Sequence, residues 1–502
     1  MTALIVLCVY LSILLGLGLF AKTFFRGTAK DYFVASHSIG PFLLLMSVFG
    51  TTMTAFALVG STGEAYRNGI GTYGKMASWS GLIHSAVFFF VGIRLWAMGK
   101  KYGYVTQVQY FRDRFDSNFI GYLLFPILIG LVIPYLLVGI LGAGGVIASI
   151  TADPDVAWLE TGVPRWLTGL VICAIVLSYI FFGGLRAAAW ANTFQTLVFM
   201  ITGVVTVWLI SSKLGGPAAA TQAVLDNADH AHKLSRENIP PWQFFSYLFI
   251  PLSVGMFPHI FQHWLTAAKA STFKLAIVAH PICIMIVWVP CVMLGVWATS
   301  ALGADGQLLV PVDHPKNSEL AIMVAKLTTP LLSGILAAGI LAAIMSSLDS
   351  QFFCLGTMFT NDMVLHNKPV GKYTEKQKVA LARGFIVAVV AVTYMLSLLE
   401  PRQVFKMGVW CFSGFSALFP LVVAALYWKR VTLAGAIACI VSTAIFWLVL
   451  FVKSGFGKSY LLLTELKIMP AAILFLFSTI ILVVVSLCTR PPSEEKIRKF
   501  FP

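Results

Sequence analysis

Three serines and one aspartate stand together inside an apolar stretch, residues 341–353, which reads LAAIMSSLDSQFF. On an α-helix each residue turns by about 100°, so Ser346, Ser347 and Ser350 share one face with Ala343. Adjacent hydroxyls and carbonyl oxygens suit a hard monovalent cation, which prefers oxygen ligands. The same face also suits a hydroxyl-lined packing seam between membrane helices. The residue types and their spacing leave both interpretations open.

The aspartate in this stretch is a candidate functional residue because an ionisable side chain is costly to bury in a membrane. Asp349 follows Ser346 by three residues and therefore lies near the same face. It could bind a cation, carry a proton, or attract a cation toward the neighbouring serines. A locally hydrogen-bonded or protonated aspartate that holds neighbouring helices together is the structural alternative.

Membrane helices must position these residues. Hydrophobic residues make up 59% of the chain and charged residues 11%, and the mean hydropathy is +0.87. A soluble domain carries about 25% charged residues. Apolar runs long enough to cross about 30 Å of hydrocarbon recur along the chain. We therefore predict an all-α polytopic membrane protein with about 13 transmembrane helices, forming a single transmembrane domain over residues 1–502.

The distribution of charge predicts orientation rather than a nucleic-acid partner. Most lysine and arginine residues fall in the loops on one side of the predicted spans, which places the N-terminus outside and the C-terminus inside. The net charge of +15 is not organised into a basic cluster interleaved with aromatic residues, so no nucleic-acid binding is expected. The sequence contains no HExxH, GxSxG or P-loop motif, and an enzyme is not expected either.

Two of the predicted spans are interrupted by glycine or proline. Residues 43–63 read LLLMSVFGTTMTAFALVGSTG, with Gly50 among threonines, and residues 249–265 read FIPLSVGMFPHIFQHWL. Breaks of this kind free backbone carbonyls, which a cation or a substrate can engage. The two segments begin five spans apart. That spacing is expected if two five-helix repeats each begin with a broken helix.

Several segments, taken in order, resemble motifs of the sodium:solute symporter family. The resembling stretches are DYFVASHSIGPF (31–42), TQVQYFRDRFDS (106–117), FFGGLRAAAWANTFQT (181–196), GMFPHIFQHWLTA (255–267) and AAIMSSLDSQ (342–351). The fourth is similar to the G-x-x-P-H-x-x-x-R-x-x-A stretch of the proline and pantothenate branch. The resemblance spans residues 31–351.

The resemblance implies a five-plus-five inverted-repeat fold. The first repeat is then 40–211 and the second 242–428, with an extra N-terminal helix in 1–30 and two extra helices in 431–489. It also implies a main sodium site, with Na⁺ as the co-transported ion. The ligands would be carbonyls and hydroxyls of Gly50, Met53, Ala343, Ser346 and Ser347.

One departure from the family pattern concerns charge. The family's Trp-Thr-Asp reads Trp190, Ala191 and Asn192 here, and the aspartate contributes to a second sodium site in some members. Asn192 lacks that charge. Our hypothesis is that Asp349 supplies the negative charge that position 192 does not.

The substrate site is expected between the two broken helices, near the middle of the membrane. A helix N-terminus and His259 could receive a carboxylate, although a structural histidine bonded to a backbone carbonyl is an equal alternative. Ala57 occupies a position where sugar-carrying relatives have glutamine, and no acid adjoins the expected wall, so a sugar or a cationic substrate is disfavoured. The expected substrate-binding residues, with the last two as a lid, are Thr51, Thr54, Ala55, Phe56, Gly255, Met256, Phe257, His259, Trp410 and Phe412.

The sequence therefore predicts a sodium-coupled symporter that moves a small organic acid or amino acid by alternating access. A proton-coupled symporter of the same fold, with Asp349 as the proton carrier, is the first alternative. A non-transporting sensor or channel is the second. The expected partners are the solute, sodium and the lipid bilayer, with a functional monomer in a bacterial inner membrane. Glu64, at the outer end of the first broken helix, is expected to be a solvated helix cap.

Overall fold

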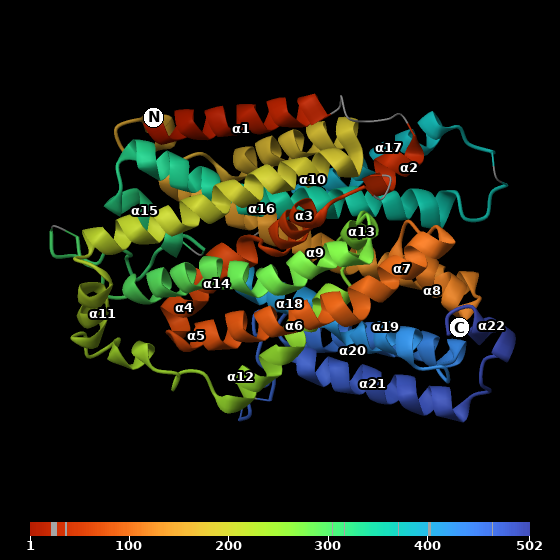
Figure 1. Ribbon diagram of the computed structural model, residues 1–502. Helices are drawn as coiled ribbons and strands as arrows, with labels where there is room; N and C mark the ends of the chain where they lie inside the picture. Colours follow the sequence, from red (N-terminus) through yellow and green to blue (C-terminus); the bar gives the residue numbers. More distant parts are fainter. Residues whose placement is uncertain are drawn as a thin grey trace.

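The computed structural model describes residues 1–21, 28–35, 38–303, 305–315, 317–369, 371–399, 403–463 and 465–501. Within these ranges the chain is almost entirely helical, and its β-pairings are isolated bridges. The long helices run side by side in one bundle, with the N-terminus at one end and the C-terminus at the other (Figure 1). The end with the N-terminus also holds the loop between α14 (Phe273–Trp297) and α15 (Glu319–Leu327) and the end of α4 (Ser61–Asn68). The end with the C-terminus holds α8 (Gln107–Phe115) and α22 (Glu494–Arg498).

In the described part of the chain, nine helices are long and apolar enough to cross a membrane, and two bent pairs raise that number to 11 if each pair is one span. Two shorter apolar helices, Thr2–Leu17 and Arg165–Phe181, also occupy predicted spans. The predicted total of about 13 spans and the orientation of the termini stay predictions. The nine long stretches are Gly71–Tyr102, Asn118–Thr151, Gly183–Lys213, Ala270–Trp297, Pro330–Val364, Glu375–Ser397, Val404–Tyr427, Leu433–Lys453 and Pro470–Cys488.

The first predicted interruption is present, but its position differs from Gly50. Helix α3 (Pro41–Thr52) ends at Met53, and the chain resumes in η3 (Phe56–Gly60) and α4 (Ser61–Asn68) at an angle of 56°. Gly50 itself is helical. A Cβ atom there would lie 2.2 Å from Thr196 Oγ1 of α10 (Arg165–Lys213). The glycine therefore allows α3 to approach α10 closely and does not break the helix.

The second interruption lies where glycine and proline predict it. Helix α12 (Pro241–Ser246) and η8 (Tyr247–Gly255) are followed by α13 (Pro258–Leu265), at an angle of 51°. Pro258 is the first residue of α13, where its missing N–H costs nothing. The break falls on Met256 and Phe257, between the glycine and the proline.

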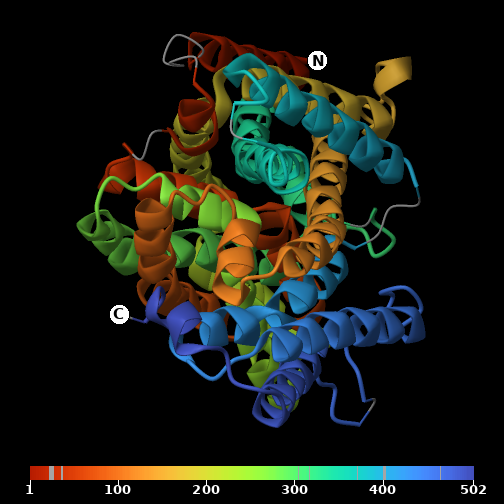
Figure 2. The same ribbon diagram turned by 90° about the vertical axis from the view of Figure 1, so that its right-hand side faces the viewer.

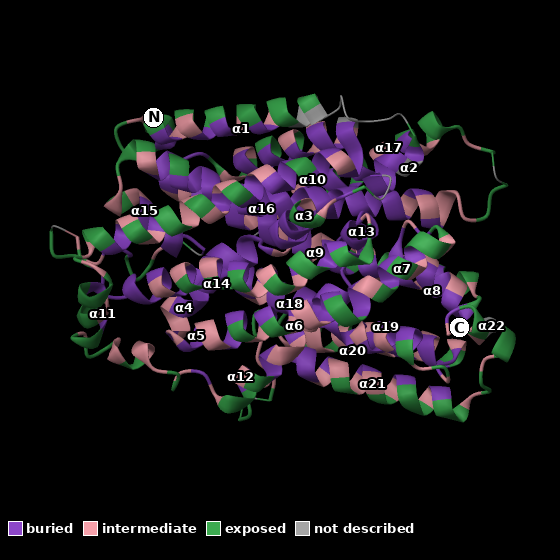
Figure 3. Ribbon diagram, in the orientation of Figure 1, coloured by how far each residue is buried: buried purple, intermediate pink, exposed green. Residues whose placement is uncertain are grey.

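Helix α16 (Pro330–Met358), which carries the serines, is enclosed by the rest of the bundle. In its most apolar window 83% of residues are buried, against 28% for α20 (Leu433–Lys453) at the periphery. Figure 2 looks along the bundle and shows α16 surrounded by other helices. Figure 3 shows much of α16 buried, and every residue from Leu336 to Met358 is buried. Its neighbours include α1 (Thr2–Ala21), α9 (Asn118–Thr151) and α10 (Arg165–Lys213).

Helix α10 covers both spans that the sequence predicts over 166–184 and 188–211. The two parts meet at Gly184, which has φ +62°, a value that favours glycine because it has no Cβ. A Cβ at this position would also lie 2.9 Å from the Tyr32 carbonyl oxygen. The kink therefore depends on a glycine beside α2 (Ala29–Val34).

The remaining helices complete the bundle and its ends. Helix α18 (Val404–Ala417) packs against α21 (Pro470–Cys488) and η8, and α20 packs against α21. The other elements are α5 (Gly71–Tyr73), η4 (Gly74–Ser78), α6 (Trp79–Val87), η5 (Phe88–Gly92), α7 (Ile93–Tyr102), α8 (Gln107–Phe115), η6 (Ala157–Leu159), α11 (Pro217–Leu225), η7 (Ala231–Leu234), η9 (Ala270–Thr272), α14 (Phe273–Trp297), α15 (Glu319–Leu327), η10 (Phe359–Val364), α17 (Glu375–Ser397), α19 (Phe419–Tyr427) and α22 (Glu494–Arg498).

Candidate functional site

The hydroxyl of Ser346 joins α16 to the end of the first broken helix. Ending α3 at Thr52 leaves the carbonyls of its last turn without helical partners. Ser346 Oγ lies 2.8 Å from the Gly50 carbonyl oxygen and 2.9 Å from that of Ala343. All three residues are buried. One predicted sodium ligand, Ser346, therefore lies within hydrogen-bonding distance of two others, Gly50 and Ala343.

The other two predicted ligands lie beside this group. Met53 is the residue at which α3 ends, and its N–H donates to the Phe49 carbonyl, 3.0 Å away. The Ser347 hydroxyl donates to the Ile344 carbonyl of its own helix at 2.8 Å. The contact with α3 is thus made by Ser346. The assignment of all five residues to a sodium site stays a prediction.

Asp349 is fully buried three residues along the same helix. The Tyr179 hydroxyl donates to its Oδ2 at 3.1 Å, and the Ser350 hydroxyl donates to its Oδ1 at 3.1 Å. The amide of Asn192, turned with its nitrogen toward the carboxylate, donates to both oxygens at 2.9 Å. Among the described residues, every hydrogen-bonding partner of Asp349 is therefore neutral.

Ser350 connects this carboxylate to the second broken helix. His263 of α13 has its Nε2 2.9 Å from Ser350 Oγ, and its Nδ1 is buried with no hydrogen-bond partner among the described residues. With the nitrogen of Asn192 turned to Asp349, the amide oxygen of Asn192 lies 2.9 Å from the same hydroxyl. Helices α10, α13 and α16 therefore meet at one serine.

Aromatic side chains surround the second break. The rings of Phe257 and His259 stack at 5.2 Å, and Tyr135 of α9 contacts both. Phe412 of α18 contacts Tyr135 at 4.8 Å and Phe257 at 5.6 Å. Phe412 also meets the ring of Phe56 edge-on at 5.0 Å. This group brings residues from both broken helices and α18 into one apolar cluster, where the sequence predicts the wall of the substrate pocket.

Unpaired polar atoms occur near both breaks. Both ring nitrogens of His259 are buried without a hydrogen-bond partner among the described residues, and so is the Thr51 hydroxyl. Burying an unpaired polar group costs about 1–3 kcal/mol, so such groups are candidates for ligand contacts. Thr54, by contrast, accepts from the Phe56 N–H at 3.0 Å and thereby shapes the first break.

The remaining predicted substrate residues line the breaks or lie apart. The Met256 sulfur is 3.3 Å from Gln107 Nε2, and a Cβ at Gly255 would lie 2.4 Å from the Phe419 ring. Ala55 is fully buried. Trp410 donates to the Ser459 carbonyl at 2.9 Å and packs against Trp447 of α20. Two residues apart on a helix is about 200° of rotation, so Trp410 and Phe412 point to opposite sides of α18.

Glu64 is not a solvated cap, because its side chain is 1% exposed. Its Oε1 receives hydrogen bonds from Lys75, Asn68 and Tyr460 at 2.6, 2.8 and 2.8 Å. Lys75 is itself fully buried. This ion pair could not be recognised from the sequence, because Glu64 and Lys75 are 11 residues apart, on opposite sides of a turn.

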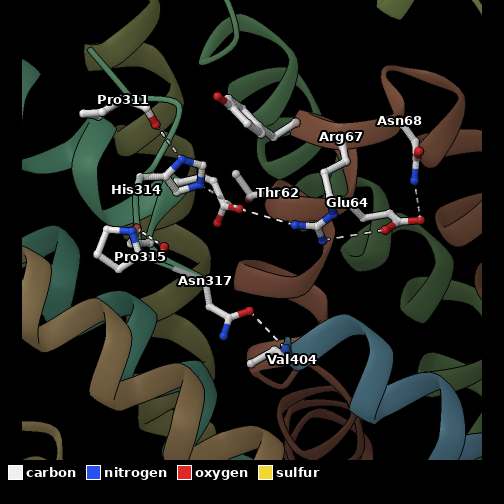
Figure 4. Close-up of polar contacts among 12 residues, drawn as sticks. Thr62, Glu64, Arg67, Asn68, Pro311, His314, Pro315, Asn317 and Val404 are labelled. Atoms are coloured by element: carbon white, nitrogen blue, oxygen red, sulfur yellow. Dashed lines mark hydrogen bonds and ion pairs between the residues drawn. The ribbon is translucent and has the colours of Figure 1, made fainter. Parts of the chain in front are cut away.

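Figure 4 shows how this cluster reaches the loop before α15. Arg67 lies 3.7 Å from Glu64 and 3.5 Å from Glu319, and His314 lies 3.3 Å from Glu319. The hydrogen bond to Glu319 raises the pKa of His314, against the opposing effect of burial. Asn317 accepts from the Val404 N–H at 3.0 Å. The loop therefore ties α4 to the start of α18.

Sequence reasoning missed Tyr135, Tyr179 and His263 as site residues. Tyr179 stands 170 residues from Asp349, and His263 stands 87 residues from Ser350. A polar or titratable side chain inside a predicted span was the available signal. Many other residues carry the same signal. Only the packing of α9, α10 and α13 distinguishes Tyr135, Tyr179 and His263 from them.

Comparison with known proteins places the chain among transporters. It matches the sodium:solute symporter family over residues 32–442. It is 26% identical over 516 aligned residues to proteins named sodium/proline symporter from Staphylococcus aureus strains JH9 and N315. These alignments cover 97% of this chain and 93% of the relatives.

Two solved structures share the fold. A Na⁺-coupled sialic acid symporter in a substrate-bound outward-open state superposes with a TM-score of 0.77 at 16% identity, covering 98% of this chain and 99% of that one. A nucleobase-cation-symport-1 family transporter in a closed conformation, with bromovinylhydantoin bound, gives 0.56 at 14% identity, covering 93% and 97%. At these identities the likeness concerns the fold alone.

Proposed function

Because this chain belongs to the sodium:solute symporter family, we propose that it is a sodium-coupled symporter of a small organic acid or amino acid, working by alternating access. The family and the named relatives are transporters and not enzymes. The chain is a multi-pass integral membrane protein. We place it in a bacterial inner membrane, as a functional monomer.

The contact between Ser346 and Gly50 carries this proposal. A sodium ion prefers oxygen ligands, and two carbonyls and one hydroxyl already converge there from two helices. Met53 and Ser347 stand next to them and would complete the set. Asp349, buried beside the group with neutral partners, supplies negative charge that favours a cation.

Sodium would act by fixing α3 against α16. Ordering the break in this way raises the affinity of the adjoining pocket for solute, and solute raises the affinity for sodium by the same factor. Ile39 and Ala267 form a parallel bridge in which the Ile39 N–H donates to the Thr266 carbonyl at 3.0 Å. This bridge links the start of α3 to the end of α13, so the two broken helices can move together against the remaining bundle.

The pocket wall indicates the class of solute. The N-terminus of α13 and the unpaired imidazole of His259 can receive a carboxylate. The rings of Tyr135, Phe257 and Phe412 suit a compact apolar body. Thr51, Thr54, Ala55, Phe56, Gly255 and Met256 line the breaks around it. Trp410 points away from this wall and is assigned a place in the packing of α20.

A sodium-dependent thermal-shift screen tests the proposal. Purified protein is mixed with monocarboxylates, amino acids including L-proline, pantothenate and sugars, each in NaCl and in KCl of equal ionic strength. We expect sodium alone to raise the unfolding temperature and one carboxylate-bearing solute to raise it further, only in NaCl. Equal stabilisation in KCl, or a sugar as the stabilising solute, would contradict the proposal.

A proton-coupled symporter of the same fold is the second candidate, and one observation favours it. A buried carboxylate without a neighbouring positive charge is destabilising unless it takes up a proton or a cation. Asp349 is such a group. Uptake into proteoliposomes that persists without sodium but collapses with a protonophore would establish this candidate in place of the first.

A further inference from the structure

A polar pocket lies at the C-terminal end of the bundle, apart from the two helix breaks. Its volume is about 430 Å³, and its lining comes from the end of α7, from α8, from the start of α9 and from His366. Ser117 precedes α9, and its side chain does not cap the helix. The first N–H groups of α9 therefore have no helical partners, and together with the helix dipole they attract an anion.

A buried arginine in the same pocket also points to an anion. The Arg112 side chain is 5% exposed, and its three guanidinium nitrogens have no hydrogen-bond partner among the described residues. The Asp362 carboxylate lies 3.6 Å away, beyond hydrogen-bonding distance, and accepts from the Thr106 hydroxyl at 2.9 Å. A Cβ at Gly121 would collide with the guanidinium, so Arg112 lies against the first turn of α9. A guanidinium with free donors suits the oxygens of a phosphate group.

An apolar groove of about 560 Å³ opens between η10 and α17. On α17 it is lined by one face of the helix, where Leu381, Gly384 and Ala388 follow one another at helical spacing. A Cβ at Gly384 would meet no atom within 4 Å, so the groove is open at this point. Helix α17 is apolar enough to cross a membrane. The groove is therefore open to the hydrocarbon of the bilayer.

Helix α9 connects the pocket to the groove. Asn118 lines the pocket, and the Arg112 guanidinium lies 5.0 Å from the ring centre of Tyr122. About one turn further, the Phe125 ring lies 6.4 Å from that of Phe359, which lines the groove. Asn118 and Phe125 are about 10 Å apart along the helix axis. The headgroup layer of a membrane has a similar depth, roughly 5–8 Å.

The segment between η10 and α17 is basic. Residues 365–378 contain four lysines and one acid, Glu375, which pairs with Lys378. The other lysines, Lys368, Lys372 and Lys376, are exposed. Figure 1 shows this loop at the same end of the bundle as α8. Exposed lysines at a membrane surface attract anionic headgroups.

Two acids also line the pocket. Lys499 Nζ lies 2.6 Å from Asp113 Oδ1 and compensates that charge. Asp116 is exposed, where water and salt screen its charge. Neither acid therefore offsets the attraction of the buried guanidinium for an anion.

We propose that the pocket and the groove form one binding site for an anionic glycerophospholipid, with its phosphodiester in the pocket and an acyl chain in the groove. The phosphate oxygens accept hydrogen bonds from the Arg112 guanidinium and from the N–H groups of Asn118 and Phe119. The acyl chain lies along Gly384 and Ala388 of α17. The lipid belongs to the leaflet at the C-terminal end of the bundle, and its binding requires neither sodium nor the transported solute.

Native mass spectrometry of the detergent-purified protein tests this inference by counting bound lipids. The protein is titrated with phosphatidylglycerol, with phosphatidylethanolamine of the same acyl chains, with glycerol 3-phosphate and with inorganic phosphate. We expect one tightly bound phosphatidylglycerol, roughly tenfold weaker binding of phosphatidylethanolamine, and no binding of the two soluble phosphates at the same concentrations. Soluble phosphates that bind as tightly as the lipid, or equal binding of the two lipids, would overturn the proposal.

Substitutions in the pocket and in the groove test the two halves of the site separately. Arg112→Gln should weaken phosphatidylglycerol binding at least tenfold. Gly384→Leu fills the groove and should weaken it similarly, with the headgroup contacts intact. Gly130→Leu is the matched control, because Gly130 is also exposed on a membrane helix with no atom within 4 Å of a Cβ; it should not change binding.

The unfolding temperature and gel filtration identify any variant that does not fold. If Arg112→Gln misfolds, Gly384→Leu still decides the question, because its position is open and exposed. The double variant Lys372→Gln, Lys376→Gln should reduce the preference for phosphatidylglycerol over phosphatidylethanolamine. Undiminished binding of phosphatidylglycerol by folded Gly384→Leu would overturn the inference.

Discussion

Glu64 and Asp349 are two of the carboxylates buried in this bundle, and their surroundings differ. Glu64 is 2.6 Å from the buried ammonium of Lys75 and 3.7 Å from Arg67. Asp349 meets only neutral donors among the described residues, namely Tyr179, Ser350 and Asn192. A buried carboxylate that is paired with a buried cation stabilises the fold. A buried carboxylate without a positively charged neighbour is stabilised only by binding a mobile cation or a proton. From this difference we propose that Glu64 is a structural acid and Asp349 a functional one.

The largest effect on stability is expected from breaking the ion pair between Glu64 and Lys75. Glu64→Gln leaves Lys75 charged and buried without its partner, which costs about 3–5 kcal/mol. We expect a marked fall in the unfolding temperature and in the yield of folded protein, measured by fluorescence-detected gel filtration after heating. The double variant Glu64→Gln, Lys75→Met should recover most of the loss, because it removes both charges. A single variant as stable as the parent would show that the pair does not hold α4.

The opposite pattern is expected for Asp349→Asn. Removing an uncompensated buried charge leaves folding unharmed or improved, while sodium affinity falls on the order of 100-fold. Sodium titration of the thermal shift and the unfolding temperature in KCl measure the two quantities separately. A loss of stability with unchanged sodium affinity would make Asp349 a structural residue like Glu64.

An intermediate effect is expected from a substitution at His259, in the expected wall of the substrate pocket. His259→Phe keeps the stacking on Phe257 but removes both unpaired nitrogens. We expect solute affinity to fall roughly tenfold, the worth of one lost hydrogen bond, with sodium affinity unchanged. Competition against the best ligand of the thermal-shift screen measures this. His280→Phe, at a buried histidine outside the wall, is the control and should not change solute affinity.

The smallest effect is expected at the end of the bundle, where His314 and Arg67 both contact Glu319. The raised pKa of His314 means that its contact with Glu319 stabilises the loop below the ordinary histidine pKa and is lost as pH rises through the raised value. The protection of residues 305–315 against hydrogen exchange, taken relative to the intrinsic exchange rate at each pH, should therefore be greater at pH 6 than at pH 8. His314→Gln should remove that difference in protection. Equal protection at both pH values in the parent would contradict the assignment.

The breaks in the helices could be predicted from the sequence because glycine and proline act locally. The second break falls between Gly255 and Pro258, as expected, whereas the first lies at Met53 and leaves Gly50 helical. Gly50 is required for the approach of α10, a tertiary contact that no local pattern encodes. The serine face of α16 was likewise predictable from helical periodicity, because Ser346 and Ser350 lie one turn apart.

The partners of the acids could not be predicted. Tyr179 and Asn192 reach Asp349 only through the packing of α10 on α16, and Lys75 reaches Glu64 across a turn. The orientation of Trp410 relative to Phe412 could be predicted from the sequence. Side chains two residues apart on a helix point about 200° apart around its axis, so Trp410 and Phe412 face opposite sides of α18. The resemblance to a family supplied the helix order, and packing decided which side chains meet.

Sodium affinity in two serine variants tests the central claim most directly. Binding of radioactive sodium to purified protein is measured in excess KCl for the parent, Ser346→Ala and Ser347→Ala, with Ser333→Ala as the control. Ser333 is also buried on α16 but lies near the start of the helix. Our account predicts saturable binding that weakens roughly tenfold or more in the first two variants and is unchanged in the control. Equal affinity in all four proteins would contradict a sodium site between α3 and α16.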